Sequence, residues 1–555
     1  MNKGLKRIIS AGLICFTLLM AGAGCGKEKQ TTSTDNAAST SSESMPGTTS
    51  DKQSNSYPIE TKETLTYWCG LNSSLVSPNF KNFGDTPFAQ ELQKETGVTV
   101  QFIHPSIGTE TQSFNLLVAS GNMPDIVETT AGTGWSTYPG GPEAAINDNV
   151  ILKLNSYFEK DAPDLKKILD SDKNYDKMVK TDSGNYYIFP YMKRDVSLNT
   201  TYGLTIRTDW LKELNLKTPE TIDDWYTVLK AFKEQKGATA PLSYAGSGDV
   251  FYPFKNGVFI GAYGITKGFF LDGSTVKFGP NENGYKDWLA TMAKWYNEGL
   301  LDTNFATNDQ KAMDANILGN KTGSLPTWPG SGLGKYIPAL QQKDPAAVLA
   351  PAPYPVLKAG DKPQFTSLLN AFDGGGACIT TSCKNPDLAA KFLNYGYSEK
   401  GILLYNYGIE GVSYTMENGV PKMTDEVMKN PKGLPVGQAW SMYAHGVYPG
   451  LTDCQKHYLD MYYVLPEQKN ALTLWTNSDM DKHLMPPVSP TTEESQMAAK
   501  IMNDVNAYVD EYTLKVIMGN DSVNNFDNYL NQLKKLEIDK AISIQQAAYD
   551  RFTKR

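Results

Sequence analysis

Cysteine and histidine are scarce in this chain of 555 residues, which has six cysteines and four histidines. Two of the cysteines, Cys15 and Cys25, fall within the first 25 residues. The long remainder of the chain keeps four: Cys69, Cys378, Cys383 and Cys454. So few cysteines exclude a disulfide-dense scaffold. The sequence leaves open whether two of the four form one bridge or all are buried thiols.

Common motifs of catalysis, nucleotide binding and metal binding are also missing. No H-E-x-x-H, P-loop, G-x-G-x-x-G or G-x-S-x-G occurs, and the four histidines show no paired spacing. Asp170–Asp176 has oxygen side chains at alternate positions, as in a calcium loop. Tyr175 replaces the turn glycine of such a loop, and Thr181 replaces its closing glutamate. The sequence therefore predicts no catalytic residue, no cofactor and no metal site.

Long apolar runs are absent except near the N-terminus. Three basic residues among the first seven precede the mostly apolar segment Ile8–Met20, and small residues then lead to Cys25. This run is shorter than the ~20 residues that a membrane-spanning helix needs, so residues 1–24 indicate a secretory signal. A cysteine directly after small residues resembles the lipobox of bacterial lipoproteins, although Gly22 stands where that motif usually has leucine. The resemblance implies lipidation at Cys25 and anchoring on the extracellular face of the cell membrane, with plain secretion as the alternative.

The segment after the signal, residues 25–57, is rich in Ser, Thr, Asn and Gly and has almost no large apolar side chains. It cannot bury enough surface to offset the entropy of ordering, so we expect a flexible tether. The body beyond it, about 500 residues, is too large for one hydrophobic core and predicts two or more lobes. The formal net charge of −8 argues against nucleic acid as a partner.

The body opens with alternating strand and helix patterns. Expected strands at 64–68, 98–104 and 123–127 alternate with expected helices at 86–96 and 111–119. Glycines that suit a helix end follow both helices. Strand, helix, strand, helix, strand predicts an α/β fold with a parallel sheet covered by helices.

Four groups of segments carry a family resemblance. They are Phe88–Val100 with Leu117–Val127, Asp182–Pro190, Arg207–Leu211 with Thr218–Trp225, and Gly375–Leu393. In this order they resemble the family 1 extracellular solute-binding proteins of ABC importers, in particular lipoproteins of the LipO or LplA type. Beyond residue 415 the resemblance fades.

The resemblance implies a two-lobed fold of the type II periplasmic-binding kind, with a hinge and a ligand cleft between the lobes. Lobe I is expected to comprise residues 58–193 and 366–422, and lobe II residues 194–365 and 423–555. It also implies a monomeric receptor that captures an oligosaccharide and delivers it to ABC permease subunits in the membrane.

Sugar sites need aromatic platforms and small polar side chains, and five residues stand at suitable places. Trp68 ends the first expected strand, Asn72 lies in the loop after it, and Trp135 follows the third strand. Trp328 and Tyr252 resemble aromatic ligand contacts of the family's second lobe, Tyr252 at the head of a long helix. For each of them the alternative is an aromatic or polar residue of the core or surface. Trp210, Trp225, Trp288 and Trp295 have helical apolar patterns and are expected in the core, whereas Trp440 and Trp475 are left open between core and cleft.

Arginine is rare as well, and its distribution is uneven. Besides Arg7 in the signal and two arginines near the C-terminus, only Arg194 and Arg207 occur, beside the first expected crossover. Because guanidinium groups bind carboxylates at two points, Arg207 or Arg194 is a candidate for reading a uronic acid. The alternatives are pairing with Asp195 or Asp209, an inter-lobe salt bridge, and a neutral sugar as ligand.

Two other functional classes remain open at this point. An anchored polysaccharide-degrading enzyme would need two carboxylates facing each other across a cleft. A peptide- or amino-acid-binding lipoprotein on the same fold would need a fixed site for the ligand's charged groups, and Arg207 is the residue that would test it.

Overall fold

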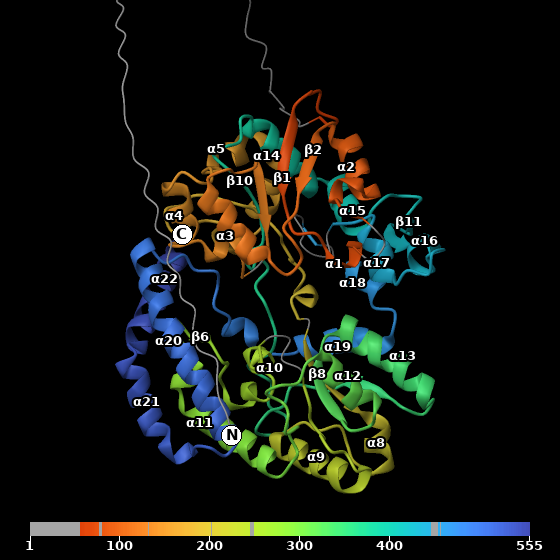
Figure 1. Ribbon diagram of the computed structural model, residues 1–555, viewed down its shortest axis with the longest axis vertical. Coiled ribbons are helices and arrows are strands. Elements are labelled where there is room, and N and C mark those ends of the chain that lie inside the picture. Colours follow the sequence, from red (N-terminus) through yellow and green to blue (C-terminus); the bar gives the residue numbers. More distant parts are fainter. Residues whose placement is uncertain are drawn as a thin grey trace, which may run out of the picture. The chain divides into compact units, whose positions relative to one another are not determined.

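The first sheet has five strands in the order β2-β1-β3-β10-β4, and the first three of these are parallel to one another. The computed structural model describes residues 56–76, 80–130, 132–200, 202–244, 249–445, 453–454 and 457–555. β1 pairs in parallel with β2 and β3, and β10 is antiparallel to β3 and β4 (Figure 1). The strands are β1 (Thr64–Trp68), β2 (Thr99–Ile103), β3 (Ile126–Thr129), β4 (Phe189–Pro190) and β10 (Gly376–Ile379). The alternation expected from the sequence is confirmed.

Local signals fix the two helices between these strands. α2 (Pro87–Thr96) begins after Thr86, whose hydroxyl accepts a hydrogen bond from the backbone N–H of Ala89. It ends at Gly97 with φ of 75°, where an added Cβ would lie 2.3 Å from the carbonyl oxygen of Ile59. α3 (Glu110–Ser120) ends in the same way, at Gly121 with φ of 68°. The two glycines therefore return the chain toward the next strand.

The remaining elements around the first sheet are helices and one hairpin. The hairpin consists of β11 (Tyr414–Glu417) and β12 (Val420–Met423). The helices are α1 (Ser73–Val76), α4 (Gly141–Asn147), α5 (Asn155–Asp161), α6 (Pro163–Asp170), α7 (Lys173–Met178), α14 (Pro386–Asn394), α15 (Glu399–Tyr407), α16 (Asp425–Met428), α17 (Val436–Ser441) and α18 (His457–Tyr462).

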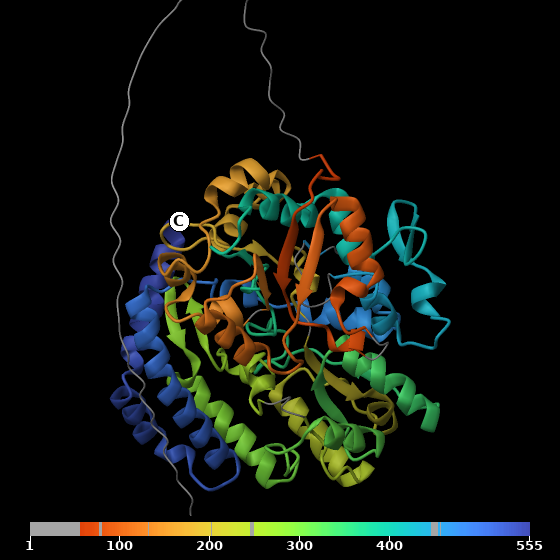
Figure 2. The same cartoon turned by 45° about the horizontal axis from the view of Figure 1, so that its top comes forward.

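A second, three-stranded sheet has the order β8-β5-β9 and is entirely antiparallel. Its strands are β5 (Gly203–Arg207), β8 (Ser324–Thr327) and β9 (Leu349–Pro351), and a separate hairpin pairs β6 (Phe269–Asp272) with β7 (Thr275–Phe278). The helices with them are α8 (Thr208–Glu213), α9 (Ile222–Lys236), α10 (Tyr252–Lys255), α11 (Asn283–Asn297), α12 (Gln310–Leu318), α13 (Gly334–Lys343), α19 (Pro466–Thr476), α20 (Thr492–Ile517), α21 (Phe526–Lys535) and α22 (Ile538–Lys554). Figure 2 shows the blue C-terminal helices packed along the green and yellow elements of this part.

Buried apolar side chains form two hydrophobic cores, one around each sheet. The chain passes between them three times, at 198–202, 365–372 and 463–471. The first two passages lie close to the expected lobe boundaries. The third does not, because the buried apolar residues between 423 and 463 belong to the first core and had been expected in lobe II. Backbone hydrogen bonds from Phe88 to Met442 and from His445 to Tyr405 tie this segment to α2 and α15.

Elements of the two cores also meet through α22 and the segment after α7. Arg551 and Arg555 both donate hydrogen bonds to the Asp182 carboxylate. Arg555, whose side chain is 3% exposed, also donates to the carbonyl oxygens of Lys177 and Lys180 at 2.8 and 2.6 Å. The arginines near the C-terminus therefore have structural partners.

The four cysteines of the body are buried and free. Burial raises the pKa of Cys383 and of Cys454 to about 12, so both remain protonated near neutral pH. The question of a disulfide bridge is thus settled in favour of thiols. Among the helices of the described residues, none is long and apolar enough to cross a membrane.

Candidate functional site

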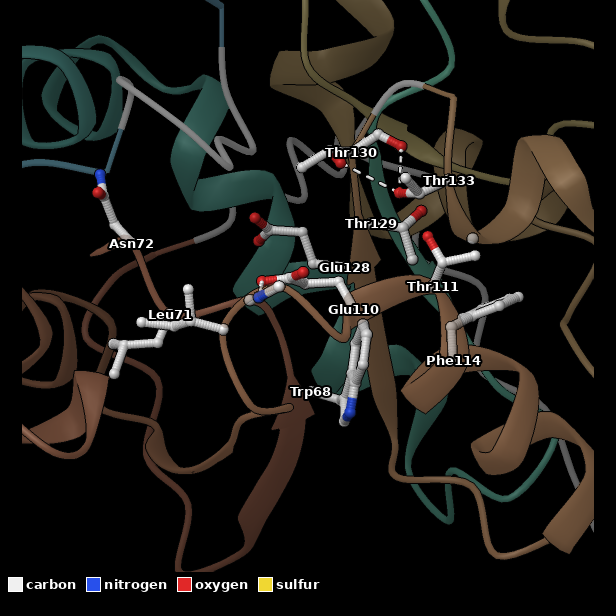
Figure 3. A pocket seen from close by; sticks show the side chains of 14 residues that line it. Trp68, Leu71, Asn72, Glu110, Thr111, Phe114, Glu128, Thr129, Thr130 and Thr133 are labelled. Atoms are coloured by element: carbon white, nitrogen blue, oxygen red, sulfur yellow. Dashed lines mark hydrogen bonds between the residues drawn. The ribbon is translucent and has the colours of Figure 1, made fainter. Parts of the chain in front are cut away.

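A pocket of about 290 Å³ opens where β1 and β3 end (Figure 3). Because Trp68 pairs with Val127 in parallel register, the chain after β1 leaves the sheet beside the chain after β3. The loop after β2 and the first turns of α3 complete the walls. Ligands of open α/β sheets bind at the carboxyl ends of strands, so this pocket is the candidate site.

The pocket wall combines apolar groups, hydroxyls and carboxylates, and none of its described residues has a basic side chain. Its residues are Trp68, Gly70, Leu71, Asn72, Ile107, Gly108, Glu110, Thr111, Phe114, Glu128, Thr129, Thr130, Thr133 and Gly134. In Figure 3 the carboxylates of Glu110 and Glu128 lie between Asn72 on one side and the threonines on the other. Such a wall suits a ligand that has both apolar faces and many hydroxyl groups.

Two aromatic rings line one side of this pocket, and a third packs behind them. Trp68, which is 6% exposed, packs against Phe114 with the ring centroids 6.4 Å apart. Phe114 in turn meets Trp135 edge to face at 5.0 Å. The indole N–H of Trp135 donates to the carbonyl oxygen of Val127 at 3.1 Å, which fixes the ring against β3. This packing holds Trp68 and Phe114 in place without a ligand.

Glu128, next to the end of β3, is held by two side chains behind the pocket. Tyr67 donates its hydroxyl to the Glu128 carboxylate, and His445 Nε2 lies 3.2 Å from Glu128 Oε1. Burial and the nearby carboxylate raise the pKa of Tyr67 well above its ordinary value, so this hydroxyl keeps its proton. The Glu128 side chain has no exposed surface. Glu128 is therefore a fixed carboxylate in the wall.

His104 has a structural role just beyond β2. Its Nε2 accepts a hydrogen bond from the backbone N–H of Phe83 at 3.0 Å, and its Nδ1 donates to the carbonyl oxygen of Cys69 at 2.9 Å. This pattern requires the neutral ring, and burial lowers the pKa of His104 accordingly. His104 therefore joins the loops after β1 and β2 to the segment before α2.

Of the predicted ligand contacts in this part, Trp68 and Asn72 line the pocket, whereas Trp135 does not. Trp135 is 0% exposed and lies behind Phe114. Its prediction as a contact is wrong because the glycine-rich segment before it lets the chain fold back, so that the indole ring packs under β3. Contact of Trp68 and Asn72 with a ligand stays a prediction.

Trp328 and Tyr252 lie together in the second core. Both are half-buried, their ring centroids are 5.4 Å apart, and both pack against the ring of Tyr202. Trp328 follows β8 directly, as expected, but α10 at Tyr252 has four residues where a long helix was expected. Their partly exposed rings keep them as predicted contacts.

Both candidate arginines are bound to carboxylates of the protein itself. Arg207 is 1% exposed, donates to both oxygens of Asp209 at 2.9 and 2.6 Å, and donates to the Asn320 side chain at 2.6 Å. Arg194 holds both oxygens of Asp453. The prediction of Arg207 as a ligand contact is wrong, because its guanidinium is covered and its donors are in use.

The other six tryptophans considered in the sequence analysis all lie in the core. Trp210, Trp225, Trp288 and Trp295 are each at most 4% exposed, which confirms their assignment. Trp440 and Trp475, which had been left open, are 0% exposed. Their indole N–H groups donate to the carbonyl oxygens of Asn406 and Ala352.

The loop that resembles a calcium site contains α7, and its carboxylates pair with lysines. Asp170 binds Lys166, and Asp176 binds Lys180. Asp172 caps α7 by accepting from the backbone N–H of Asn174. Within the described residues, no group of three or more His, Cys, Asp or Glu side chains is arranged to hold a metal ion.

Sequence reasoning missed the polar half of the pocket, notably Glu110, Glu128 and the threonines. Glu128-Thr-Thr130 directly follows the apolar end of the third strand, and this position was a usable signal. The Thr129 hydroxyl is buried in the wall and forms no hydrogen bond with another described residue.

Residues 78–402, more than half of the chain, match the family described as bacterial extracellular solute-binding protein. The chain belongs to this family. It is 24% identical over 528 residues to the fructooligosaccharide ABC transporter substrate-binding protein FusA of Streptococcus pneumoniae serotype 4 (strain ATCC BAA-334 / TIGR4), covering 89% of this chain and 92% of FusA. It is 26% identical over 421 residues to lipoprotein LipO of Bacillus subtilis (strain 168), covering 72% of this chain and 76% of LipO.

Among solved structures, the alginate-binding protein AlgQ2 without calcium ion superposes with a TM-score of 0.69. It is 27% identical, and the match covers 88% of this chain and 98% of AlgQ2. The mixed α/β fold is therefore the fold of solute-binding proteins. Family membership assigns the chain to solute capture and not to turnover.

Proposed function

We propose that this solute-binding protein is the lipid-anchored receptor of an ABC importer that captures an oligosaccharide and delivers it to the membrane permease. The pocket at the ends of β1 and β3 carries the proposal, because it joins an aromatic side to hydroxyl, amide and carboxylate groups. The names of FusA and AlgQ2, which state sugar ligands, support the ligand class.

In this proposal the two cores contribute different contacts. The ring edges of Trp68 and Phe114 face the C–H surface of a sugar, and Asn72 and the threonines pair with its hydroxyls. Trp328 and Tyr252 supply a second aromatic platform from the other core. A hinge motion at the three passages between the cores closes the protein over the ligand and favours the form that the permease recognises.

The peptide-binding alternative loses its main support in the structure. It relied on Arg207 as the group that binds an α-carboxylate, and this guanidinium is occupied by Asp209 and Asn320. The part of the pocket wall that the structure describes has no basic side chain. An α-carboxylate would therefore enter the pocket without a partner of opposite charge.

Asn72→Ala is expected to weaken oligosaccharide binding about tenfold, because one or two hydrogen bonds to sugar hydroxyls are lost. The test is calorimetry on residues 26–555 with a sugar found in a thermal-shift screen of oligosaccharides, dipeptides and amino acids. Asn122→Ala is the matched control, since Asn122 is an exposed amide in the loop before β3, at the other end of that strand. Equal affinities of both variants would contradict this site, and shifts with peptides alone would contradict the ligand class.

The lipid site and residues 25–55 of the expected tether lie outside the described residues, so their test is biochemical. Cys25→Ala in the secreting host is expected to move most of the protein from the membrane fraction to the medium. Cys15→Ala is the control, because it lies within the expected signal and is removed with it. Retention of the Cys25 variant on the membrane would show that a different anchor acts.

A further inference from the structure

The charges at the pocket bear on which sugars it accepts. Among the described residues that line it, Glu110 and Glu128 are the only ionisable ones, and both are acids. Glu128 is covered and held in place by Tyr67 and His445. Glu110 is half-buried in the first turn of α3; its Oε1 accepts from the backbone N–H of Gly108 at 2.9 Å. Its Oε2 has no hydrogen-bond donor among the described residues and is open to a donor from a ligand.

No arginine in the described part of the chain is free to balance these charges. All four arginines of the described residues bind carboxylates of the protein: Arg194 with Asp453, Arg207 with Asp209, Arg551 with Asp182 and Glu494, and Arg555 with Asp182. The described part of the pocket wall therefore lacks the bidentate group that best recognises a uronate.

We propose that this pocket selects uncharged oligosaccharides and rejects those that contain uronic acids, with Glu110 as the discriminating residue. This inference rests on the proposed function. A sugar hydroxyl donates a proton to the free Glu110 oxygen, whereas an ionised uronate has none to donate at its carboxylate and is repelled. The names of the relatives leave this choice open, because fructooligosaccharides are uncharged and alginate is a polyuronate.

The first test compares neutral and acidic tetrasaccharides on residues 26–555, which retain the whole compact unit Asn55–Arg555. Calorimetry with nystose, stachyose and maltotetraose is expected to show binding by at least one of them. Tetragalacturonate and tetraguluronate are expected to bind at least about 100-fold more weakly than the best neutral sugar. A uronate that binds as tightly as the best neutral sugar overturns this inference and leaves the proposed function intact. No binding by any of the five overturns the proposed function.

The second test is Glu110→Gln, which keeps the size and one acceptor oxygen but removes the charge. The dissociation constant of the neutral sugar is expected to rise about 3- to 10-fold, since a charge-assisted hydrogen bond becomes a neutral one. The ratio of uronate to neutral dissociation constants is expected to fall at least about fivefold. Glu493→Gln, in the first turn of α20 and exposed, is the matched control.

An unchanged ratio in Glu110→Gln would overturn the assignment of this residue. Binding of chitosan tetramer more tightly than every neutral sugar would overturn the preference for uncharged ligands and show that the two carboxylates recognise a cation.

Discussion

Arg207→Gln is expected to lower the free energy of unfolding by about 3–5 kcal/mol while leaving the affinity of the folded protein for its sugar unchanged. The side chain is 2% exposed and makes three hydrogen bonds, two to Asp209 and one to Asn320. Its guanidinium also lies over the ring of Trp210, with Cζ 4.6 Å from the ring centroid. Glutamine replaces none of this geometry and leaves the partly covered Asp209 carboxylate without its cation. Urea unfolding monitored by circular dichroism measures the stability, and calorimetry at a temperature where the variant is folded measures the affinity.

Lys212→Gln is the control for the loss of one positive charge, because Lys212 lies on α8, the helix that begins directly after Arg207, and is exposed. It is expected to change stability by no more than about 0.5 kcal/mol. The opposite pattern, a stable Arg207 variant that no longer binds sugar, would place Arg207 in the site and contradict its pairing with Asp209. The comparison thus separates a structural arginine from a recognition arginine.

The elements of the first sheet could be predicted from the sequence because their signals are local. Thr86 lies at the start of α2 and Gly97 at its end, and each acts through contacts within a few residues. The apolar pair Ile126–Val127 indicates a buried strand. Such signals depend on backbone geometry near the residue itself. The parallel pairing then follows from the alternation of strands and helices.

The failures concern partners that are distant in the sequence. Arg207 binds Asn320, 113 positions away, and Glu128 meets His445, 317 positions away. Distant contacts also explain why the third passage between the two cores lies far from the expected lobe boundary. The segment that contains Trp440 has no strand alternation, and only the three-dimensional contacts with α2 and α15 assign it to the first core.

The pocket could be predicted in part. Trp68 and Asn72 were found because they lie at the end of a strand and in the loop after it, and Glu128 and Thr129 likewise lie at the end of β3. The chain has 60 acidic residues, and in the sequence none is distinguished as a pocket carboxylate. The acidic character of the wall therefore depends on the fold, which brings Glu110 of α3 beside the end of β3.

Trp475→Ala is expected to lower the free energy of unfolding by about 3–5 kcal/mol, which is the usual cost of truncating a buried tryptophan. The indole ring is 0% exposed and lies against the backbone of β5, where a Cβ added at Gly203 would be 2.4 Å from its Cδ2. Its N–H donates to the carbonyl oxygen of Ala352 at 3.0 Å, just after β9. This one side chain therefore joins α19 to two strands of the second sheet.

Trp475→Phe separates packing from hydrogen bonding at this position. It keeps an aromatic ring but leaves the buried Ala352 carbonyl without its donor, so a loss of about 1–3 kcal/mol is expected. Trp328→Ala removes the same side chain from a half-buried position and is expected to cost less stability than Trp475→Ala. Denaturant unfolding of the three variants measures this order. If Trp475→Ala were the mildest of the three and instead abolished sugar binding, the indole ring would belong to the ligand site and not to the core.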